Sequence, residues 1–198
     1  AERIGARNLI TFDMGGTTAK ASVIENGQII RTSEFEIGGD LSASSRLIKG
    51  SGQLIRIPAI DLVEVGAGGG SVAWLDRGGG LHVGPRSVGS RPGPACYGLG
   101  NDEPTVTDAN VVLGYLNANY IVGGTVRIDG GRSWQAIESR IASRMGLSIE
   151  RAAHGIYTLA NDNMTRAVRA VTIERGRDPS NFVMIVFGGN GPLHGPAI

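Results

Sequence analysis

A strand that breaks abruptly at glycine is the feature that most restricts what this chain can fold into. Residues 8–13 are typical of a buried strand, and they lead directly into Met14-Gly15-Gly16-Thr17-Thr18. A strand that ends in Gly-Gly exposes successive backbone N–H groups without side chains in the way, and here two hydroxyls follow. Such a turn can donate several hydrogen bonds to a phosphate without a lysine. An ordinary hairpin turn is the alternative interpretation.

Asp13 is the acidic side chain at the end of this strand. A carboxylate there is placed to hold a phosphate-bound Mg²⁺, directly or through water, or to orient an attacking water. We therefore predict a nucleotide-phosphate site in which Gly15, Gly16, Thr17 and Thr18 hold the phosphates. In this site Asp13 would be the metal-binding and catalytic carboxylate.

A second strand ends in the same way. Residues 182–187 are a continuous apolar run of strand length, which suits a parallel strand covered on both faces. Gly188-Gly189-Asn190 follows, and Pro192 suits the first turn of a helix. Two strands of one α/β layer that both break at Gly-Gly form a crevice of the kind where ligands bind, one loop facing phosphate and the other a base or ribose. The alternative is that Gly188 and Gly189 only permit tight packing of strand and helix.

The remaining strand signals are short and separated by turn residues. Segments 21–25 and 28–31 are joined by Asn26-Gly27, the strongest short signal for a type I′ hairpin, and a further strand is expected over 32–37. Between 38 and 53 we expect a loop with one short helix. Glycine clusters separate three further strand candidates that predict a hairpin insertion: 62–65, 71–75 and 81–83.

Three helices are expected in the second half of the chain before the strand at 182–187. The first is capped by Thr107 or Asp108 and runs to about residue 116. The second is capped by Ser133 and stops at Gly146, and the longest runs from Ser148 to the region of Gly176 and Pro179. The apolar face of the second helix holds Trp134, Ile137 and Ile141.

Composition and charge exclude several functional classes. The 198 residues carry a formal net charge of +1 and no basic stripe with interleaved aromatic residues, so no nucleic-acid partner is expected. No apolar stretch approaches the roughly 18 residues that cross a bilayer, and no signal peptide is evident, so we expect no membrane partner and a cytoplasmic location. Cys96 is the only cysteine, which excludes an internal disulfide and a thiolate zinc cage.

Five segments, in order along the chain, resemble the hydantoinase A/oxoprolinase family, and the chain looks like part of an N-methylhydantoinase A-like subunit. They cover nearly the whole chain: 12–18, 64–71, 92–98, 103–110 and 187–194. The resemblance implies an actin-like ATPase fold, in which two ribonuclease-H-like halves close on ATP. This chain would be one α/β half, a mixed sheet flanked by helices, with a glycine-rich β-hairpin insertion. Residues 13–18 resemble the second phosphate loop, and Gly188, Gly189 and Asn190 resemble the adenosine loop.

The expected organisation is a single domain over 1–198. Segments 1–37 and 105–198 would form the ribonuclease-H-like core, and 60–104 the glycine-rich β insertion. Family members are much longer and carry another Asp-x-Gly-Gly-Thr segment near their N-terminus, so we expect an excised fragment that holds the second half. Two positions depart from the family pattern: Lys20 stands where Asp is common, and Asn190 where Ala is common.

The resemblance also implies ATP-dependent chemistry with Mg²⁺. The expected function is that of the nucleotide-binding half of a hydantoinase/oxoprolinase-type subunit, which phosphorylates the carbonyl of a cyclic amide substrate (a lactam or hydantoin) for ring opening. A hydantoinase B-type second subunit or fused region would supply hydrolysis, and the full-length protein would be oligomeric. The alternatives are an acetone/acetophenone-type carboxylase subunit, a non-catalytic docking module for the partner subunit, and a small-molecule kinase on the same fold.

Three further residues carry two interpretations each. Asp108 is either a helix cap alone or a catalytic carboxylate that faces the cleft. His194 is either structural or a contact to ligand or partner. Cys96 is interpreted as a structural thiol, because no His or Asp pattern beside it shows how it would be activated.

Overall fold

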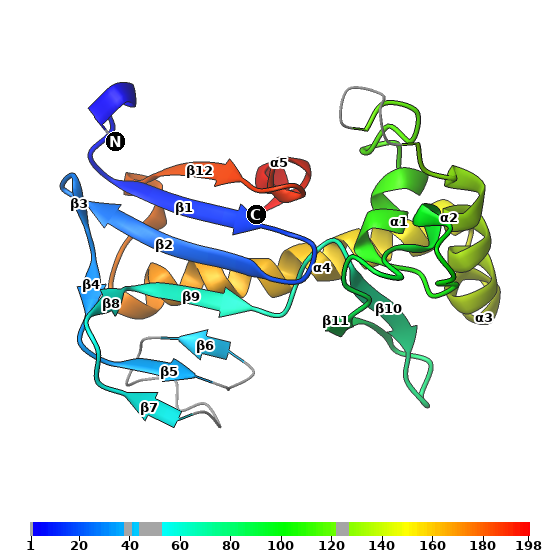
Figure 1. The fold of residues 1–198 in the computed structure, drawn as a ribbon, viewed down its shortest axis with the longest axis horizontal. Coiled ribbons are helices and arrows are strands. Elements are labelled where there is room, and N and C mark those ends of the chain that lie inside the picture. Colours follow the sequence, from blue (N-terminus) through cyan, green and yellow to red (C-terminus); the bar gives the residue numbers. More distant parts are fainter. Residues whose placement is uncertain (1, 38–40, 44–52, 122–126) are drawn as a thin grey trace. The chain divides into compact units, whose positions relative to one another are not determined.

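The structure, a computed structural model, describes residues 2–37, 41–43, 53–121 and 127–198 (Figure 1). Its contacts divide the chain into two compact units. Unit 1 comprises residues 1–66 and 163–198, and unit 2 comprises residues 67–162. Helix α4 (Ile149–Val171) contributes residues to both units.

Unit 1 is built on a mixed sheet (Figure 1). Within the described residues it has six strands, in the order β12-β1-β2-β9-β6 with β3 paired to β2. β1 (Leu9–Met14) runs parallel to β12 (Val183–Phe187) and antiparallel to β2 (Ala19–Glu25). β9 (Leu62–Val65) lies between β2 and β6 (Leu41–Ala43), antiparallel to both. The two strands predicted to end in Gly-Gly are therefore neighbours in one sheet.

The predicted hairpin at Asn26-Gly27 is confirmed. Asn26 and Gly27 have φ values of 52° and 81°, the positive values that a type I′ turn needs, and β3 (Gln28–Ile29) returns along β2. The next expected strand is divided in two, and each half pairs with a short strand in a small sheet of its own. These pairs are β4 (Arg31–Thr32) with β8 (Ala59–Ile60), and β5 (Phe35–Ile37) with β7 (Gln53–Ile55). The short helix expected between 38 and 53 falls largely outside the described residues.

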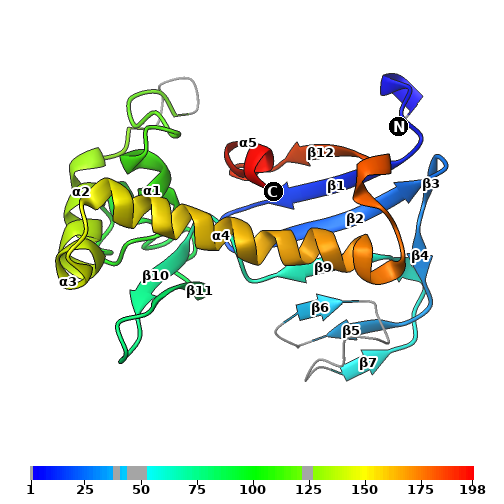
Figure 2. The same cartoon turned by 180° about the vertical axis from the view of Figure 1, so that it is seen from behind.

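One face of the large sheet forms the core of unit 1. Side chains alternate along β1, so Ile10, Phe12 and Met14 are buried on the same face. Helix α4 runs along the sheet in Figure 2, and its buried residues in this unit include Met164 and Ala167. The opposite face is more polar toward the carboxyl end of β1, which leaves Asp13 half-buried.

The chain returns from α4 to β12 through short turns tied to the sheet. α4 is followed by 3-10 helices η5 (Ile173–Arg175) and η6 (Pro179–Asn181), and Gly176 adopts φ 74° between them. Arg175 pairs with buried Asp61, and Arg177 Nε lies 3.2 Å from Glu25 Oε2. Beyond β12, α5 (Gly191–His194) and η7 (Gly195–Ala197) follow. A short 3-10 helix, η1 (Glu2–Ile4), precedes β1.

The predicted burial of β12 on both faces is wrong for the described residues. The strand is parallel, as expected, but it lies at the end of the sheet order, and Val183 and Phe187 are 52% and 47% exposed. The apolar residues of this strand are therefore not buried on both faces, although a continuous apolar run is typical of a strand that is.

Unit 2 combines a β-hairpin with short helices. The hairpin is β10 (Ser71–Leu75) with β11 (Leu81–Ser87), and the 3-10 helix η2 (Ala95–Tyr97) follows. The helices are α1 (Val106–Val112), α2 (Gly130–Ile137), the π-helix η4 (Glu138–Ala142), α3 (Ser143–Met145) and the start of α4.

The helix starts predicted in this unit are corrected. Thr105, rather than Thr107 or Asp108, is the N-cap of α1, and Asp129, rather than Ser133, is the N-cap of α2. α1 also ends at Val112 instead of near residue 116. Trp134 is 38% exposed, so Ile137 and Ile141 make the buried face without it. The stop at Gly146, with φ 65°, agrees with the prediction.

The division into units differs from the domain boundaries expected from the sequence. The segment expected as an insertion, 60–104, contributes β9 to the large sheet through pairing with β2, whereas β10 and β11 belong to unit 2. Helices α1 and α2, expected in the core with β1, also belong to unit 2. No helix in the described ranges is long and apolar enough to cross a membrane.

Candidate functional site

The structure brings the two Gly-Gly loops together at one end of the sheet. The parallel register places Asp13 opposite Phe187, so both loops leave the sheet at the carboxyl ends of adjacent strands. The Asn190 backbone N–H donates to the Met14 carbonyl at 3.0 Å, and the Asn190 side-chain amide donates to the Gly15 carbonyl at 3.2 Å. The two loops that were predicted to lie at one edge of the sheet are thus in contact within unit 1.

Gly188 explains how Asp13 can lie against the second loop. Gly188 has φ 87°, and a Cβ atom there would lie 2.3 Å from Asp13 Oδ1 and 2.5 Å from the Met14 carbonyl oxygen. Only a residue without a side chain permits this approach. A close backbone approach therefore requires glycine at position 188, and the neighbours that it meets are Asp13 and Met14 of β1 and not a helix.

The Asp13 carboxylate has no hydrogen bond or ion pair with any residue in the described part of the chain. It is half-buried at the end of β1, between the first loop and Gly188. An acceptor held in place but unpaired can take a cation or a water molecule. The same part of the chain contains no group of three or more His, Cys, Asp or Glu side chains that could hold a metal ion. A Mg²⁺ bound by Asp13 would therefore need phosphate or water oxygens for its other ligands.

Gly16 and Gly189 lack such a structural reason. A Cβ atom at either position would meet nothing within 4 Å, and neither residue lies in the left-handed region. Gly16 and Thr17 are exposed at the tip of the first loop, which is closed by the Gly15 N–H donating to the Thr18 carbonyl at 3.0 Å. The open space at Gly16 and Gly189 leaves both backbones accessible to a ligand.

Lys20 and Glu64 lie in register with Asp13, which sequence reasoning did not detect. Asp13 faces Lys20 across β1 and β2, and Lys20 faces Glu64 across β2 and β9. Lys20 Nζ lies 3.9 Å from Glu64 Oε1, with both side chains partly exposed. These three residues lie on three different strands, and only the pairing of β1 with β2 and of β2 with β9 brings them together.

His194 is buried in α5, directly after the second loop. Burial lowers the pKa of its imidazole to about 4, because the charged form would lose its hydration. His194 is therefore neutral at physiological pH, and its exposed fraction of 0% supports the structural interpretation over direct contact with a ligand.

Asp108 lies in unit 2 at the centre of a buried hydrogen-bond network. Within the described residues its carboxylate accepts hydrogen bonds from five donors, which are the backbone N–H groups of Ala95, Cys96 and Thr105 and the hydroxyls of Thr105 and Ser133. Asp108 also completes a capping box with Thr105 at the start of α1. This geometry supports the cap interpretation, and a catalytic role for Asp108 stays an untested prediction.

Cys96 is a buried free thiol beside Asp108. Burial, followed by the negative charge of Asp108, raises the pKa of the thiol far above its usual value. A neutral buried thiol is a poor nucleophile, which agrees with the structural interpretation.

The glycine-rich segment after β9 uses its polar groups within unit 2. The Gly68 N–H donates to Ser71 Oγ, and the carbonyls of Gly69 and Gly70 accept from the backbone N–H groups of Thr107 and Val88. These contacts favour a tight turn over an anion-binding loop.

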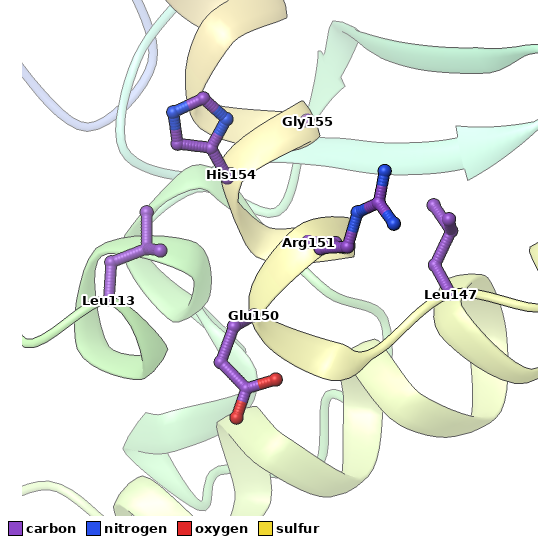
Figure 3. A pocket seen from close by; sticks show the side chains of 6 residues that line it. All are labelled: Leu113, Leu147, Glu150, Arg151, His154 and Gly155. Carbon is purple, nitrogen blue, oxygen red and sulfur yellow. The ribbon is translucent and has the colours of Figure 1, made fainter.

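Unit 2 also has an open pocket of about 490 Å³ (Figure 3). None of the predicted site residues lines it. In Figure 3 Glu150 and Arg151 point in different directions from the start of α4, and His154 lies near Leu113. Its lining is Leu113, Leu147, Glu150, Arg151, His154 and Gly155.

The fold and the paired loops define a class of protein. The chain is α/β, with a mixed sheet flanked by helices and two Gly-Gly loops at the ends of adjacent parallel strands. This is the arrangement expected of a ribonuclease-H-like half of an actin-like ATPase fold. The family model for hydantoinase/oxoprolinase matches residues 1–198, and the chain belongs to that family.

Relatives and solved structures agree with this assignment. An uncharacterized protein of Methanocaldococcus jannaschii is 55% identical over 94% of this chain and 27% of its own length. The caprolactamase subunit alpha of Pseudomonas jessenii is 44% identical over 98% of this chain and 26% of its own length. The crystal structure of the ATP-dependent caprolactamase from that organism matches with a TM-score of 0.79 and 42% identity, over 100% of this chain and 27% of that one.

A nucleotide-free structure of acetone carboxylase, from work on ATP-dependent acetone carboxylation, matches with a TM-score of 0.82 and 32% identity. It covers 98% of this chain and 26% of that chain. The chain thus spans about a quarter of the length of the relatives that it matches.

Proposed function

We propose that this chain is the nucleotide-binding part of an ATP-dependent enzyme that activates the carbonyl of a cyclic amide by phosphorylation. The family includes hydantoinases and oxoprolinases by its description, and a caprolactamase is among the similar proteins. All three names denote enzymes that open a cyclic amide. Two similar structures are those of an ATP-dependent caprolactamase and of an acetone carboxylase whose carboxylation depends on ATP, which supports ATP as the nucleotide.

The observation that carries this proposal is the open space at Gly16 and Gly189. The fold itself demands glycine at Gly188, but neither packing within 4 Å nor a left-handed backbone demands it at the other two positions. Their backbones end adjacent parallel strands, where ligands bind in α/β sheets. A nucleotide that spans the two loops would account for both glycines.

Each loop then has a separate role. Gly16, Thr17 and Thr18 hold phosphate oxygens through backbone N–H groups and hydroxyls. Gly15 belongs to the same loop and closes it, because its N–H donates to the Thr18 carbonyl. Gly188, Gly189 and Asn190 line the adenosine side, Asn190 through its backbone, because its side chain is bonded to the first loop.

Asp13 is proposed as the metal-binding and catalytic carboxylate of this site. Its unpaired oxygens suit Mg²⁺, which prefers carboxylate, phosphate and water oxygens. When bound, the metal would neutralise charge on the phosphates. Asp13 would hold it directly or through water and would fix the position of the phosphates relative to the amide oxygen.

Phosphorylation solves a chemical difficulty of amide opening. The amide carbon is a poor electrophile, and attack of the amide oxygen on the γ-phosphorus, with release of ADP, gives an O-phosphorylated imidate whose carbon water attacks readily. The ring C–N bond then breaks, which leaves a free amine and an acyl phosphate, and a second water molecule releases the phosphate. The overall products are the ring-opened amino acid, ADP and phosphate. We infer that a second subunit or fused region carries out the hydrolytic step, and the designation of the caprolactamase relative as a subunit alpha supports this.

A carboxylase subunit is the second candidate, because the acetone carboxylase structure is as similar in fold as the caprolactamase. In that case phosphorylation would activate bicarbonate or a ketone. The higher sequence identity to the caprolactamase favours the amide. ATP turnover that depends on lactam and not on bicarbonate would support the amidohydrolase, and the reverse would support the carboxylase.

Calorimetric titration with Mg-ATP tests the nucleotide site. In the full-length protein, Gly16→Val and Gly189→Val are expected to weaken ATP binding at least about tenfold, because a side chain would block the approach of the ligand to the backbone. Both variants are expected to fold, since each new side chain enters open space. Gln28→Val, an exposed change on the neighbouring hairpin, is the control.

ATP binding that is unchanged in both glycine variants would contradict the two-loop site. The role of Asp13 is tested separately, by Asp13→Ala in the full-length protein together with its partner subunit. ATP turnover is expected to be lost, and undiminished turnover would exclude Asp13 from the chemistry. If nucleotide binding is absent but the partner subunit still binds, the chain is a docking module instead.

A further inference from the structure

Asn190 occupies the cap position of α5 but does not cap it. Asparagine at this position usually accepts a hydrogen bond from a backbone N–H of the first helical turn. Here the side chain makes no capping hydrogen bond. Its Nδ2 instead donates to the carbonyl of Gly15, 175 residues away in the sequence, at 3.2 Å. The side chain is thus committed to the first loop and not to its own helix.

This contact determines the direction of the next peptide group. The carbonyl of Gly15 and the N–H of Gly16 belong to one planar trans peptide, so they point in opposite directions. Because glycine lies on both sides of this peptide, its rotation meets little steric resistance. A hydrogen bond to the Gly15 carbonyl therefore selects one of the orientations that the loop could adopt.

Asn190 is bonded to the first loop by both its backbone and its side chain. The Asn190 backbone N–H donates to the Met14 carbonyl at 3.0 Å, beside the side-chain contact to Gly15. The Gly15 N–H donates to the Thr18 carbonyl at 3.0 Å on the other side of the turn. With these contacts in place, the Gly16 N–H points away from Asn190, and a Cβ atom at Gly16 would meet nothing within 4 Å.

We propose that Asn190 is a positioning residue that holds the Gly15–Gly16 peptide with the Gly16 N–H directed at a nucleotide phosphate. The inference rests on the proposed function and adds to it a separate role for each of the two loops. The second loop sets the donor geometry of the first, and the Asn190 side chain does so without contact to the nucleotide.

The test compares a ligand with phosphates and one without. Calorimetric titrations of the full-length protein use Mg-ADP and adenosine on wild type, Asn190→Asp and Asn190→Ala. Asp keeps the size but removes the N–H donor. We expect ADP affinity to fall about tenfold or more, since a hydrogen bond to a charged phosphate is lost, while adenosine affinity is unchanged. Asn181→Ala, an exposed asparagine in η6, is the control.

The outcomes separate this inference from the proposed function. An equal loss of ADP and adenosine affinity would mean that Asn190 contacts the nucleoside. An unchanged ADP affinity would mean that the hydrogen bond from Asn190 to the Gly15 carbonyl is not needed to position the Gly16 N–H. Either result overturns the inference and leaves the nucleotide site intact. A wild-type protein that binds neither ligand would refute the proposed function and the inference together.

A second measurement does not depend on binding. In a crystal structure of nucleotide-free Asn190→Ala, we expect the Gly15–Gly16 peptide to occupy the flipped orientation or both orientations. A single orientation, the same as in the wild-type protein, would overturn the positioning role even if affinity changed.

Discussion

At the scale of single residues, Asp108 connects separate segments of unit 2 through one carboxylate. Its donors come from η2, from the start of α1 and from α2, and the residue is fully buried. A buried carboxylate of this kind is stabilising only while its donors remain in place.

We expect Asp108→Asn to lower the free energy of unfolding by about 3 kcal/mol or more, because the amide group loses acceptor capacity and adds N–H groups where donors already point. Denaturant titration measures this, with the exposed Asp162→Asn as the control. Normal stability combined with lost ATP turnover would instead assign Asp108 to catalysis.

His194 makes the stability of unit 1 depend on pH. Its pKa is about 4 in the folded chain, below the usual 6.5, so the unfolded chain binds the proton more readily between these values. Stability is therefore full above about pH 6.5 and falls as the pH decreases toward 4. Between pH 7.5 and pH 5 we expect His194 to account for a loss of about 2 kcal/mol.

Urea titrations at the two pH values measure this loss as the difference between wild type and His194→Gln. The variant should show the smaller pH dependence, since its side chain does not titrate. His154→Gln, an exposed change in α4, is the control for the loss of a histidine side chain. Identical slopes for wild type and His194→Gln would contradict the lowered pKa.

Candidate site residues could be selected from the sequence where a short local pattern marks them. Asp13 and the glycines after it could be selected from strand-end chemistry alone, because a Gly-Gly strand end with nearby polar groups is a local signal. The contact of Asn190 with Gly15 and the row of Asp13, Lys20 and Glu64 were not predictable, since both depend on pairing between distant segments.

At the scale of elements, the second loop contains two glycines with different tasks. We expect Gly188→Ala to cost about 2 kcal/mol or more, because alanine is strained at φ 87° and its Cβ would displace Asp13 or Met14. Gly189→Ala enters open space and should change stability by less than about 0.5 kcal/mol. Denaturant titration of the two variants gives the comparison, and equal losses would contradict the close approach.

Helix starts were mispredicted because several capping residues lie close together. Thr105, Thr107 and Asp108 all have side chains that can cap a helix, and in the structure Thr105 is the cap and Asp108 completes the capping box with it. Ser133 has the right chemistry for a cap, but its hydroxyl donates to Asp108 inside α2. Strand positions were predicted better, since Asn26-Gly27 and the glycine clusters mark where strands end.

At the scale of the whole molecule, the division into two units could not be predicted from local patterns. β9 was expected in one insertion with β10 and β11, yet it pairs with β2 in the large sheet, whereas β10 and β11 pair with each other. The partner of a strand depends on segments far away in the sequence, and the period-two pattern within the strand does not specify it. The fold class itself was predictable from the motifs, because they occur in order along the whole chain.

The exposed edge strand predicts self-association of the 198-residue chain. Val183→Lys places a charge on β12, where Val183 is 52% exposed, and should lower light scattering at equal protein concentration. Ile29→Lys, also at a position 52% exposed but on the two-residue strand β3, is the matched control and should have a smaller effect. Equal effects would show that general charge, and not the strand edge, controls association.

The outer side of β12 also makes this association a matter of concentration. Within the described residues β12 pairs only with β1, so one row of its backbone groups is open to any extended segment that comes near. A segment tethered to the same polypeptide acts at an effective concentration on the order of millimolar. A second chain at micromolar concentration would compete poorly with such a segment. A covalently linked strand of similar intrinsic affinity would therefore occupy the edge of β12 and prevent association between chains at that concentration.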